Sequence, residues 1–155
     1  MKPEYKYDAG ELFLDKEGRW FHEGVEITHR LTLELFSRSL QPDPAGGYKL
    51  VVGVEWAPVR VEDTPYVVRQ VTIAADRAML HLSDGTDEEL IAATLRQNED
   101  NVLYCDVKEA RFPARFLRPA YYQLMERLCE CEGGYAIDLG GRLCPIRCPE
   151  THQGG

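Results

Sequence analysis

The sequence predicts an α+β protein of two small related lobes, in each of which an antiparallel sheet or hairpin packs with an amphipathic helix. Short strand-like runs separated by turn residues occupy much of residues 11–82. Residues 28–40 and 119–129 carry apolar side chains at helical spacing. Residues 14–21 and 137–144 both follow the pattern apolar-Asp-x-x-Gly-Arg-apolar-apolar, which predicts one hairpin near each end of the chain.

The shared hairpin pattern has two interpretations. A tight turn needs a side chain that accepts backbone N–H bonds and a glycine that takes positive φ, so the pattern also arises without duplication. Each hairpin nevertheless adjoins an amphipathic helix in the sequence. An internal structural repeat and a coincidence of turn chemistry therefore both stay open.

The first lobe is predicted to span residues 9–82, after a flexible polar leader of residues 1–8. Its opening hairpin pairs residues 11–15 with residues 19–22. Gly18 lies in the connecting turn, where a residue without Cβ takes positive φ at no steric cost.

A helix and a sheet follow this hairpin. Thr28 is the expected N-cap of the helix, because its hydroxyl can accept a bond from an early helical N–H group. Pro42 and Pro44 come after the last apolar position and end the helix. The next runs are rich in β-branched and aromatic residues, so we expect one antiparallel sheet. Its four strands are expected at residues 48–54, 58–61, 66–73 and 78–82.

The second lobe is predicted to span residues 83–148, before a mobile tail of residues 149–155. Pro119 suits the first turn of its main helix, since the missing N–H has no helical partner there. Gly133 and Gly134 should stop that helix. The expected elements are a helix at 87–97, a strand at 102–107, a helix at 119–129, and a hairpin of 135–139 with 142–146.

Composition excludes several functional classes. The chain has 155 residues, with 26 Asp plus Glu against 18 Lys plus Arg and a net charge of -8. Such a chain repels phosphate, so we predict neither nucleic-acid nor membrane partners. The first residues contain no apolar stretch typical of a signal peptide, which predicts a cytoplasmic protein. In that compartment its 5 cysteines are expected to be thiols or metal ligands rather than a disulfide framework.

Three segments resemble a known family. Residues 15–36 combine an acidic-Gly turn, Trp-Phe, a Gly-x-x-Ile step leading to an Arg, and a helix with Leu33, Leu35 and Phe36. Residues 61–68 read Val-Glu-Asp-Thr-Pro-Tyr-Val-Val, and residues 118–124 read Arg-Pro-Ala-Tyr-Tyr-Gln-Leu. The chain thus resembles the uncharacterised bacterial family labelled domain of unknown function 1285.

The resemblance implies two similar lobes in an α+β arrangement. It also implies a suspected ligand-binding or signalling role, without an established activity. Two segments, residues 53–58 and residues 86–101, do not resemble the corresponding parts of the family.

Two arginines lie at the predicted helix starts. Arg30 follows the Thr28 cap by two residues, and Arg118 directly precedes Pro119. A helix N-terminus already carries partial positive charge, so a negative ligand placed there would relieve both charges. The alternative is an internal salt bridge, for instance of Arg30 with Glu26 or Glu34, or of Arg118 with Asp63.

Aromatic side chains and a histidine complete the candidate ligand site. Trp20, Trp56 and Tyr122 are candidates to line a pocket, because small-molecule sites are mostly apolar with a few placed polar groups. The alternative is that these side chains belong to the core, which alternation along the strand favours for Trp20 or Phe21. Tyr122 and Trp56 are expected to be exposed. His29 is a further candidate contact, or, like His22, a catalytic base.

The cysteines at the end of the chain raise the question of zinc. Cys129, Cys131, Cys148 and His152 are the candidate ligands, with Cys144 between them in the sequence. No C-x-x-C knuckle occurs, and Cys144 alternates as a core residue would. Free thiols, buried or reactive, are the preferred interpretation, and we predict neither a metal nor a cofactor.

These observations favour a noncatalytic ligand-binding or regulatory module for a small anionic ligand, with its site between the lobes. One alternative is a small enzyme with His22 or His29 as base, although the chain lacks G-x-S-x-G, P-loop and H-E-x-x-H motifs. The other alternative is a homodimeric interaction module that binds through its aromatic surface.

Overall fold

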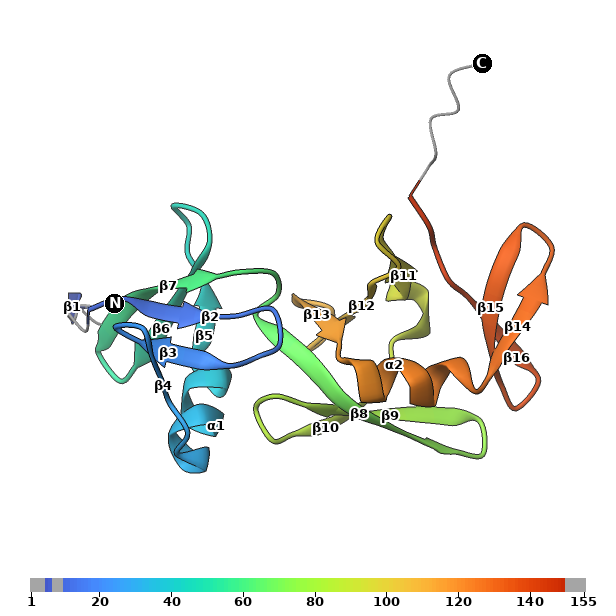
Figure 1. Cartoon of the computed structure of the whole chain (residues 1–155), viewed down its shortest axis with the longest axis horizontal. Coiled ribbons are helices and arrows are strands. Elements are labelled where there is room, and N and C mark those ends of the chain that lie inside the picture. Colours follow the sequence, from blue (N-terminus) through green and yellow to red (C-terminus); the bar gives the residue numbers. More distant parts are fainter. Residues whose placement is uncertain (1–4, 7–9, 150–155) are drawn as a thin grey trace, which may run out of the picture. The chain divides into compact units, whose positions relative to one another are not determined.

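The computed structural model of the chain describes residues 5–6 and 10–149. The fold class is α+β: two α-helices, α1 (Arg30–Arg38) and α2 (Arg118–Met125), accompany three sheets within those residues (Figure 1). The chain divides into two compact units. The first unit runs to Val67 and includes Ser83–Thr86, and the second comprises Val68–Leu82 and the chain from Asp87 onward.

The first unit is built on one sheet. Its six-strand path has the order β4-β3-β2-β7-β6-β5, and β1 (Tyr5–Lys6) pairs with β7 beside it. Strands β2 and β7 are parallel, whereas the other neighbours in the path are antiparallel. The remaining strands are β2 (Leu12–Leu14), β3 (Trp20–His22), β4 (Val25–Glu26), β5 (Leu40–Pro42), β6 (Tyr48–Val52) and β7 (Glu55–Val61).

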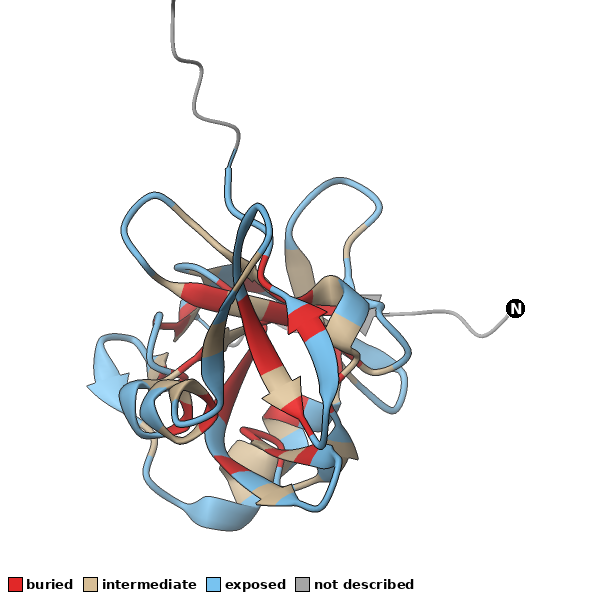
Figure 2. Ribbon diagram, turned by 90° about the vertical axis from the view of Figure 1, so that its right-hand side faces the viewer, coloured by how far each residue is buried: buried red, intermediate tan, exposed pale blue. Residues whose placement is uncertain are grey.

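The core of this unit lies between one face of the sheet and α1. Successive strand residues point to opposite faces, so Leu12 and Leu14 are buried while Phe13 between them is only half-buried. Leu33 and Phe36 of α1 pack against the buried side chains. Leu33 and Phe36 are three residues apart and share the face of α1 that meets the core, whereas Leu31 and Leu35 are exposed. Figure 2 colours each residue by its burial.

The second unit contains a sheet with the same strand order and a smaller sheet. The larger sheet runs β10-β9-β8-β13-β12-β11, and the smaller runs β14-β15-β16. A single 3-10 turn, η1 (Ala92–Thr94), lies between β10 and β11, just as α1 lies between β4 and β5 in the first unit. The strands are β8 (Tyr66–Ala74), β9 (Arg77–Leu82), β10 (Asp87–Glu89), β11 (Arg96–Gln97), β12 (Leu103–Val107), β13 (Phe112–Phe116), β14 (Leu128–Cys131), β15 (Gly134–Leu139) and β16 (Arg142–Pro145).

The predicted α+β class with two similar lobes is confirmed, but the predicted single sheet of residues 48–82 is wrong. Strands β6 and β7 belong to the first sheet, and β8 and β9 belong to the second. Sequence spacing indicates strands without saying which of them pair. The compact units also divide the chain elsewhere than at residue 82, because residues 68–82 cluster with the second unit.

The helix predicted at residues 87–97 is absent. Glu88 lies opposite Leu80 in β9, and the Leu90 N–H donates to the Ala78 carbonyl, so this segment extends the sheet. Leu90 and Leu95 are buried, as their apolar character requires, but Leu90 follows β10 and Leu95 follows η1. Residues 90, 91, 94 and 95 are spaced as on one helical face, and the hydrogen bonds to β9 prevail over that spacing.

The ends of both helices also differ from expectation. His29 rather than Thr28 is the N-cap of α1. Helix α2 stops at Met125, and Cys129 lies in β14 opposite Ala136. The two glycines at 133 and 134 connect strands β14 and β15 instead of ending a helix.

The two hairpins with the shared sequence pattern form as predicted but occupy different places. The first, β2–β3, lies within the first sheet, whereas the second, β15–β16, belongs to the small third sheet. Their turn chemistry is similar: Asp15 Oδ1 accepts from the Arg19 N–H, and Asp138 Oδ1 accepts from the Gly141 N–H. The similarity between the two units lies elsewhere: strands β2 to β7 are arranged in their sheet in the same order as strands β8 to β13 in theirs.

Candidate ligand pocket in the first unit

A cavity of about 630 Å³ opens between α1 and the sheet of the first unit. This volume falls in the range of roughly 300–1,000 Å³ that is typical of small-molecule sites. Every lining residue belongs to the first unit, so the pocket is a property of that unit alone. The lining residues are Leu12, His22, Ile27, Thr32, Phe36, Leu50, Val52, Glu55, Trp56 and Ala57.

The floor of the pocket is the core itself. Leu12, Leu50 and Ala57 are each at most 6% exposed and come from three adjacent strands, β2, β6 and β7. Phe36 and Trp56 add aromatic walls from α1 and β7. A ligand in this pocket would cover apolar surface, which favours binding by about 25 cal/mol for each Å² removed from water.

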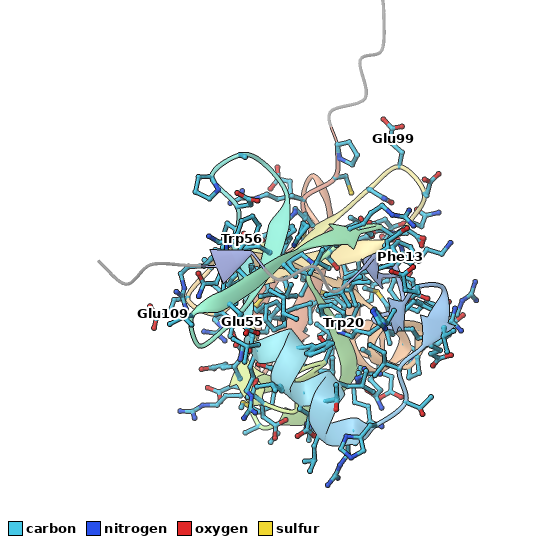
Figure 3. All side chains as sticks on the ribbon, turned by 90° about the vertical axis from the view of Figure 1, so that its left-hand side faces the viewer. Phe13, Trp20, Glu55, Trp56, Glu99 and Glu109 are labelled. Atoms are coloured by element: carbon cyan, nitrogen blue, oxygen red, sulfur yellow. The ribbon has the colours of Figure 1, made fainter. Side chains whose placement is uncertain are left out.

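Polar groups of the pocket come from three different elements. Thr32 lies in the first turn of α1, His22 ends β3, and Glu55 begins β7, where Figure 3 labels it beside Trp56. Thr32 is held in place by the helix cap: its N–H donates to His29 Nδ1 at 3.3 Å, and its Oγ1 lies 2.9 Å from the same nitrogen. His29 thus supports the pocket through Thr32 rather than lining it.

Charges of both signs surround the pocket. The Lys49 ammonium lies 5.5 Å from the centre of the Trp56 ring, which is within cation–π range. Arg30 begins the helix that supplies Thr32 and Phe36, and no carboxylate pairs with Arg30 within residues 5–6 and 10–149. Glu55 is exposed and supplies the one acidic side chain of the lining.

Trp20 belongs to the core and not to the pocket surface. Its side chain is 1% exposed, and its indole N–H donates to the Ser37 hydroxyl at 3.3 Å. The ring packs edge-on against Phe36 at 5.4 Å, so Trp20 lies behind a residue that lines the pocket. Trp20 and His22 lie on the same face of β3, because they are two residues apart, but Trp20 is buried whereas His22 at the end of the strand is exposed.

Arg118 and Tyr122 lie in the second unit and do not line this pocket. Arg118 is the first residue of α2 and is exposed. The salt bridges found among the described residues do not include Arg118. Tyr122 is 59% exposed and makes an edge-on contact with Tyr121 at 5.5 Å.

Thr32, Phe36 and Glu55 are pocket residues that the sequence analysis did not select. Thr32 and Phe36 are four residues apart, so they lie on one face of α1. Glu55 shares a sheet face with the buried Ala57, since residues two apart along a strand point the same way. The alternation along this strand could have predicted that the Glu55 carboxylate lies on the same face as the buried apolar residues.

The cysteines show no metal geometry within the described residues. Those residues contain no group of three or more His, Cys, Asp or Glu side chains that would hold a metal ion. Cys129 and Cys131 are half-buried in β14, and Cys148 is exposed. Burial raises the pKa of the Cys105 thiol to about 12. His152, the fourth candidate zinc ligand, lies outside the described residues.

Comparison with known proteins places the fold. One solved structure, a DUF1285 family protein from Silicibacter pomeroyi DSS-3, superposes with a TM-score of 0.76 at 21% identity, covering 93% of this chain and 83% of that one. A second, a DUF1285 family protein from Shewanella baltica OS155, gives 0.63 at 20% identity, covering 77% and 94%. The chain has the fold of DUF1285 proteins.

This likeness supports the DUF1285 resemblance drawn from the sequence motifs. No family model and no curated protein matches the chain. The first DUF1285-like motif, residues 15–36, supplies His22, Ile27 and Phe36 to the pocket lining. No helix in residues 5–6 and 10–149 is long and apolar enough to cross a bilayer.

Proposed function

We propose that this protein is a noncatalytic ligand-binding module of the DUF1285 type, and that it serves a regulatory or signalling role. Its ligand would be a small molecule with an apolar body and a negatively charged group, held in the pocket between α1 and the first sheet. The observation that carries the proposal is this cavity of about 630 Å³, floored by core residues and walled by Phe36 and Trp56.

The apolar part of the proposal follows from the lining. Seven of its ten residues are apolar or aromatic, namely Leu12, Ile27, Phe36, Leu50, Val52, Trp56 and Ala57. A pocket of this kind gives affinity through buried area and uses its few polar groups for orientation. Thr32 suits that orienting role, because the His29 cap fixes its position.

The anionic part of the proposal rests on charge. Lys49 beside Trp56 and Arg30 at the start of α1 favour a negative group, as does the positive end of the helix dipole. Glu55 opposes it, which makes the sign of the ligand charge a question for experiment. This site replaces the one expected between the lobes as the place where we propose that ligand binds.

A thermal-shift screen tests whether the pocket binds ligand. We expect carboxylates and phosphates with an apolar body to stabilise the protein, by about 2.7 kcal/mol at a concentration of 100 times Kd. Trp56→Ala should lower the affinity about tenfold, because it removes one wall of the pocket. Tyr122→Ala, an exposed aromatic in the second unit, is the matched control and should leave affinity unchanged. A ligand that stabilises both variants equally would contradict this site.

A pair of charge variants tests the sign of the ligand. For an anionic ligand, Lys49→Gln should weaken binding about threefold and Glu55→Gln should strengthen it by a similar factor, as expected for charges that stay in contact with water. Both effects should shrink at high salt. The opposite signs would establish a cationic ligand, and the anionic part of the proposal would fall while the pocket itself stood.

The other two candidate functions keep one supporting observation each. His22 lines the pocket, so an enzyme that uses it as base would act at the same site. Val25 and Leu31 are 70% and 61% exposed, which favours an apolar contact such as a homodimer. Light scattering of the full chain discriminates, since a monomer at high concentration would contradict the dimer.

We also propose the cytoplasm as the place of action. Cys105, Cys129, Cys131, Cys144 and Cys148 are all free thiols, which fits a reducing compartment.

A further inference from the structure

We propose that Thr72, His81 and Asp87 in the second unit form an activated nucleophile that accepts acyl groups from reactive esters. His81 lies between the other two: one ring nitrogen is 2.9 Å from Thr72 Oγ1, and the other is 2.6 Å from Asp87 Oδ1. This site is separate from the ligand pocket and from the function proposed for it. Neither His22 nor His29 takes part.

A β-bulge brings these side chains to one face of the sheet. Val68 pairs with Leu82 and Gln70 pairs with His81, so Arg69 is an extra residue in β8. If β8 kept strict alternation through Arg69, residues 70 and 72 would share the inward face of buried Val68. Because of the bulge, Val71 is buried and Thr72 points outward, diagonal to His81 across the β8–β9 pair.

Helix α2 and its N-cap residue, Leu117, hold the bulge from the other side. The Gln123 amide oxygen accepts the Val71 N–H at 2.6 Å, and the Leu117 N–H donates to the Val68 carbonyl at 3.0 Å. These two bonds bracket the bulged residue. The position of Thr72 is therefore fixed by backbone contacts on both sides of Arg69.

Asp87 sets the tautomer of His81. A carboxylate accepts hydrogen bonds only, so the short bond requires the proton on Nδ1. In the neutral ring Nε2 is then the acceptor, and it receives the hydrogen bond from the Thr72 hydroxyl. A hydroxyl nucleophile, a histidine base and an orienting carboxylate in this order are the arrangement by which alcohols are activated for acyl transfer.

Gln70 supplies a group to face the developing negative charge. It lies opposite His81 and two residues from Thr72 on the same face of β8. Its side chain is exposed and makes no hydrogen bond within residues 5–6 and 10–149. An amide N–H of this kind stabilises the oxyanion of a tetrahedral intermediate when it lies near the nucleophile.

The proposed step balances as follows. Thr72 Oγ1 forms a bond to the ester carbonyl carbon while its proton passes to His81 Nε2. The tetrahedral intermediate then expels the alcohol portion of the ester, which takes up that proton, and Thr72 carries the acyl group. Water, activated by the same histidine, later breaks the Thr72 ester to give a free acid and regenerates the hydroxyl.

The chain contains its own comparison site. Thr32 Oγ1 also lies 2.9 Å from a histidine nitrogen, His29 Nδ1, but that nitrogen is engaged by the Thr32 N–H as well. No carboxylate contact of His29 occurs within the described residues. If proximity of histidine were enough, both threonines would react.

The test is site-resolved acetylation of the full chain by p-nitrophenyl acetate. Peptide mass spectrometry after brief reaction and acid quench should locate an acetyl group on Thr72 and none on Thr32. His81→Gln and Asp87→Asn should each slow Thr72 acetylation, with His81→Gln costing about a hundredfold, the usual contribution of a general base. Thr72→Ser should keep the reaction, whereas Thr72→Val should abolish it.

Thr28→Val is the matched control, because Thr28 is an exposed threonine outside both sites. If the Thr72 ester turns over too fast to isolate, steady release of p-nitrophenolate that Thr72→Val removes supports the proposal equally. Acetyl groups only on lysines and cysteines, with release unchanged in Thr72→Val, would overturn it. So would acetylation of Thr72 that is unchanged in His81→Gln.

Discussion

The position of a side chain in this protein depends on how much apolar surface it can bury and on whether its polar atoms find hydrogen-bond partners. Trp20 and Trp56 illustrate the difference. Trp20 is sealed in the core, where Ser37 accepts its indole N–H, whereas Trp56 is half-buried and lines a pocket. Trp20 lies in β3 and Trp56 in β7, and the packing around each strand decides how far the ring is buried.

Truncation of Trp20 should therefore act on stability. Trp20→Ala leaves a cavity beneath Phe36 and should lower the free energy of unfolding by about 3–5 kcal/mol. Trp56→Ala should cost less, since part of that side chain already contacts water. Urea unfolding followed by circular dichroism measures both. A smaller loss for Trp20→Ala than for Trp56→Ala would contradict the assignment of Trp20 to the core.

Cys105 makes stability depend on pH. Burial, and then the Asp106 carboxylate, raise the pKa of its thiol from 9.0 to about 12 in the folded chain. Between these values the unfolded state loses the proton first, so the native state binds more protons and stability falls as the pH rises. Below pH 9 the contribution is fully present.

We expect Cys105→Ala to show a shallower loss of unfolding free energy between about pH 9 and 12 than wild type. Tyrosines and lysines titrate in both proteins, so the difference between their slopes isolates the thiol. Cys148→Ser, which alters an exposed cysteine, should keep the wild-type slope. Parallel curves for wild type and Cys105→Ala would refute the buried-thiol assignment.

At the scale of elements, turns and bulges decide which side chains meet. Gly18 closes the first hairpin at φ +82°, and a Cβ there would lie 2.6 Å from Val67 Cγ2. Gly24 adopts nearly the same φ, +79°, but has open space around it. A comparison of the two glycines therefore distinguishes the cost of a positive φ, which both share, from the cost of a steric clash, which only Gly18 would have.

Gly18→Ala should consequently destabilise the chain more than Gly24→Ala. Both substitutions carry the cost of positive φ, about 1 kcal/mol, and only the first adds a clash with Val67. The difference between their midpoints in urea measures that clash. Equal midpoints would show that Val67 moves aside freely.

The bulge in β8 has an equally local test. Deletion of Arg69 should remove the bulge and leave Val71 inward and Thr72 outward, because Gln70 would then follow Val68 in strict alternation. We therefore expect Thr72 acetylation to be retained in the deletion variant. Its loss would mean that the bulge itself, and not the register of residues 70–72 with β9, positions the nucleophile.

For the whole molecule, the two compact units are not consecutive in the chain. Residues 68–82 join the second unit, and residues 83–86 return to the first. Strands β8 and β9 bury Val71, Ala78, Leu80 and Leu82 in a sheet completed by β13. A cut at residue 82 therefore separates these strands from their partners.

The fragment 1–82 should fail to fold as an independent lobe. Its last two strands would expose an apolar face that the full chain covers, which predicts aggregation or a dimer rather than a monomer. Analytical ultracentrifugation beside the full chain gives the measurement. A monomeric fragment with a cooperative unfolding transition would instead support the lobe boundary drawn from the sequence.

Local sequence patterns were sufficient for elements whose structure depends on neighbours in the chain. Turn glycines with an upstream Asp predicted both hairpins, and apolar spacing predicted α1 and the start of α2. The segment at 87–97 failed because Leu90 and Leu95 are compatible with a helix or with strands. Hydrogen bonds to β9, which lies earlier in the chain, decided in favour of strands.

The amino-acid sequence by itself determined the α+β class, the two amphipathic helices and Trp56 as a candidate ligand contact. Tertiary structure decided strand partners, the pocket with Thr32, Phe36 and Glu55, and the meeting of Thr72, His81 and Asp87. The physical reason is range: propensity and periodicity act over a few residues, whereas a site is made by side chains that distant backbone hydrogen bonds bring to one face.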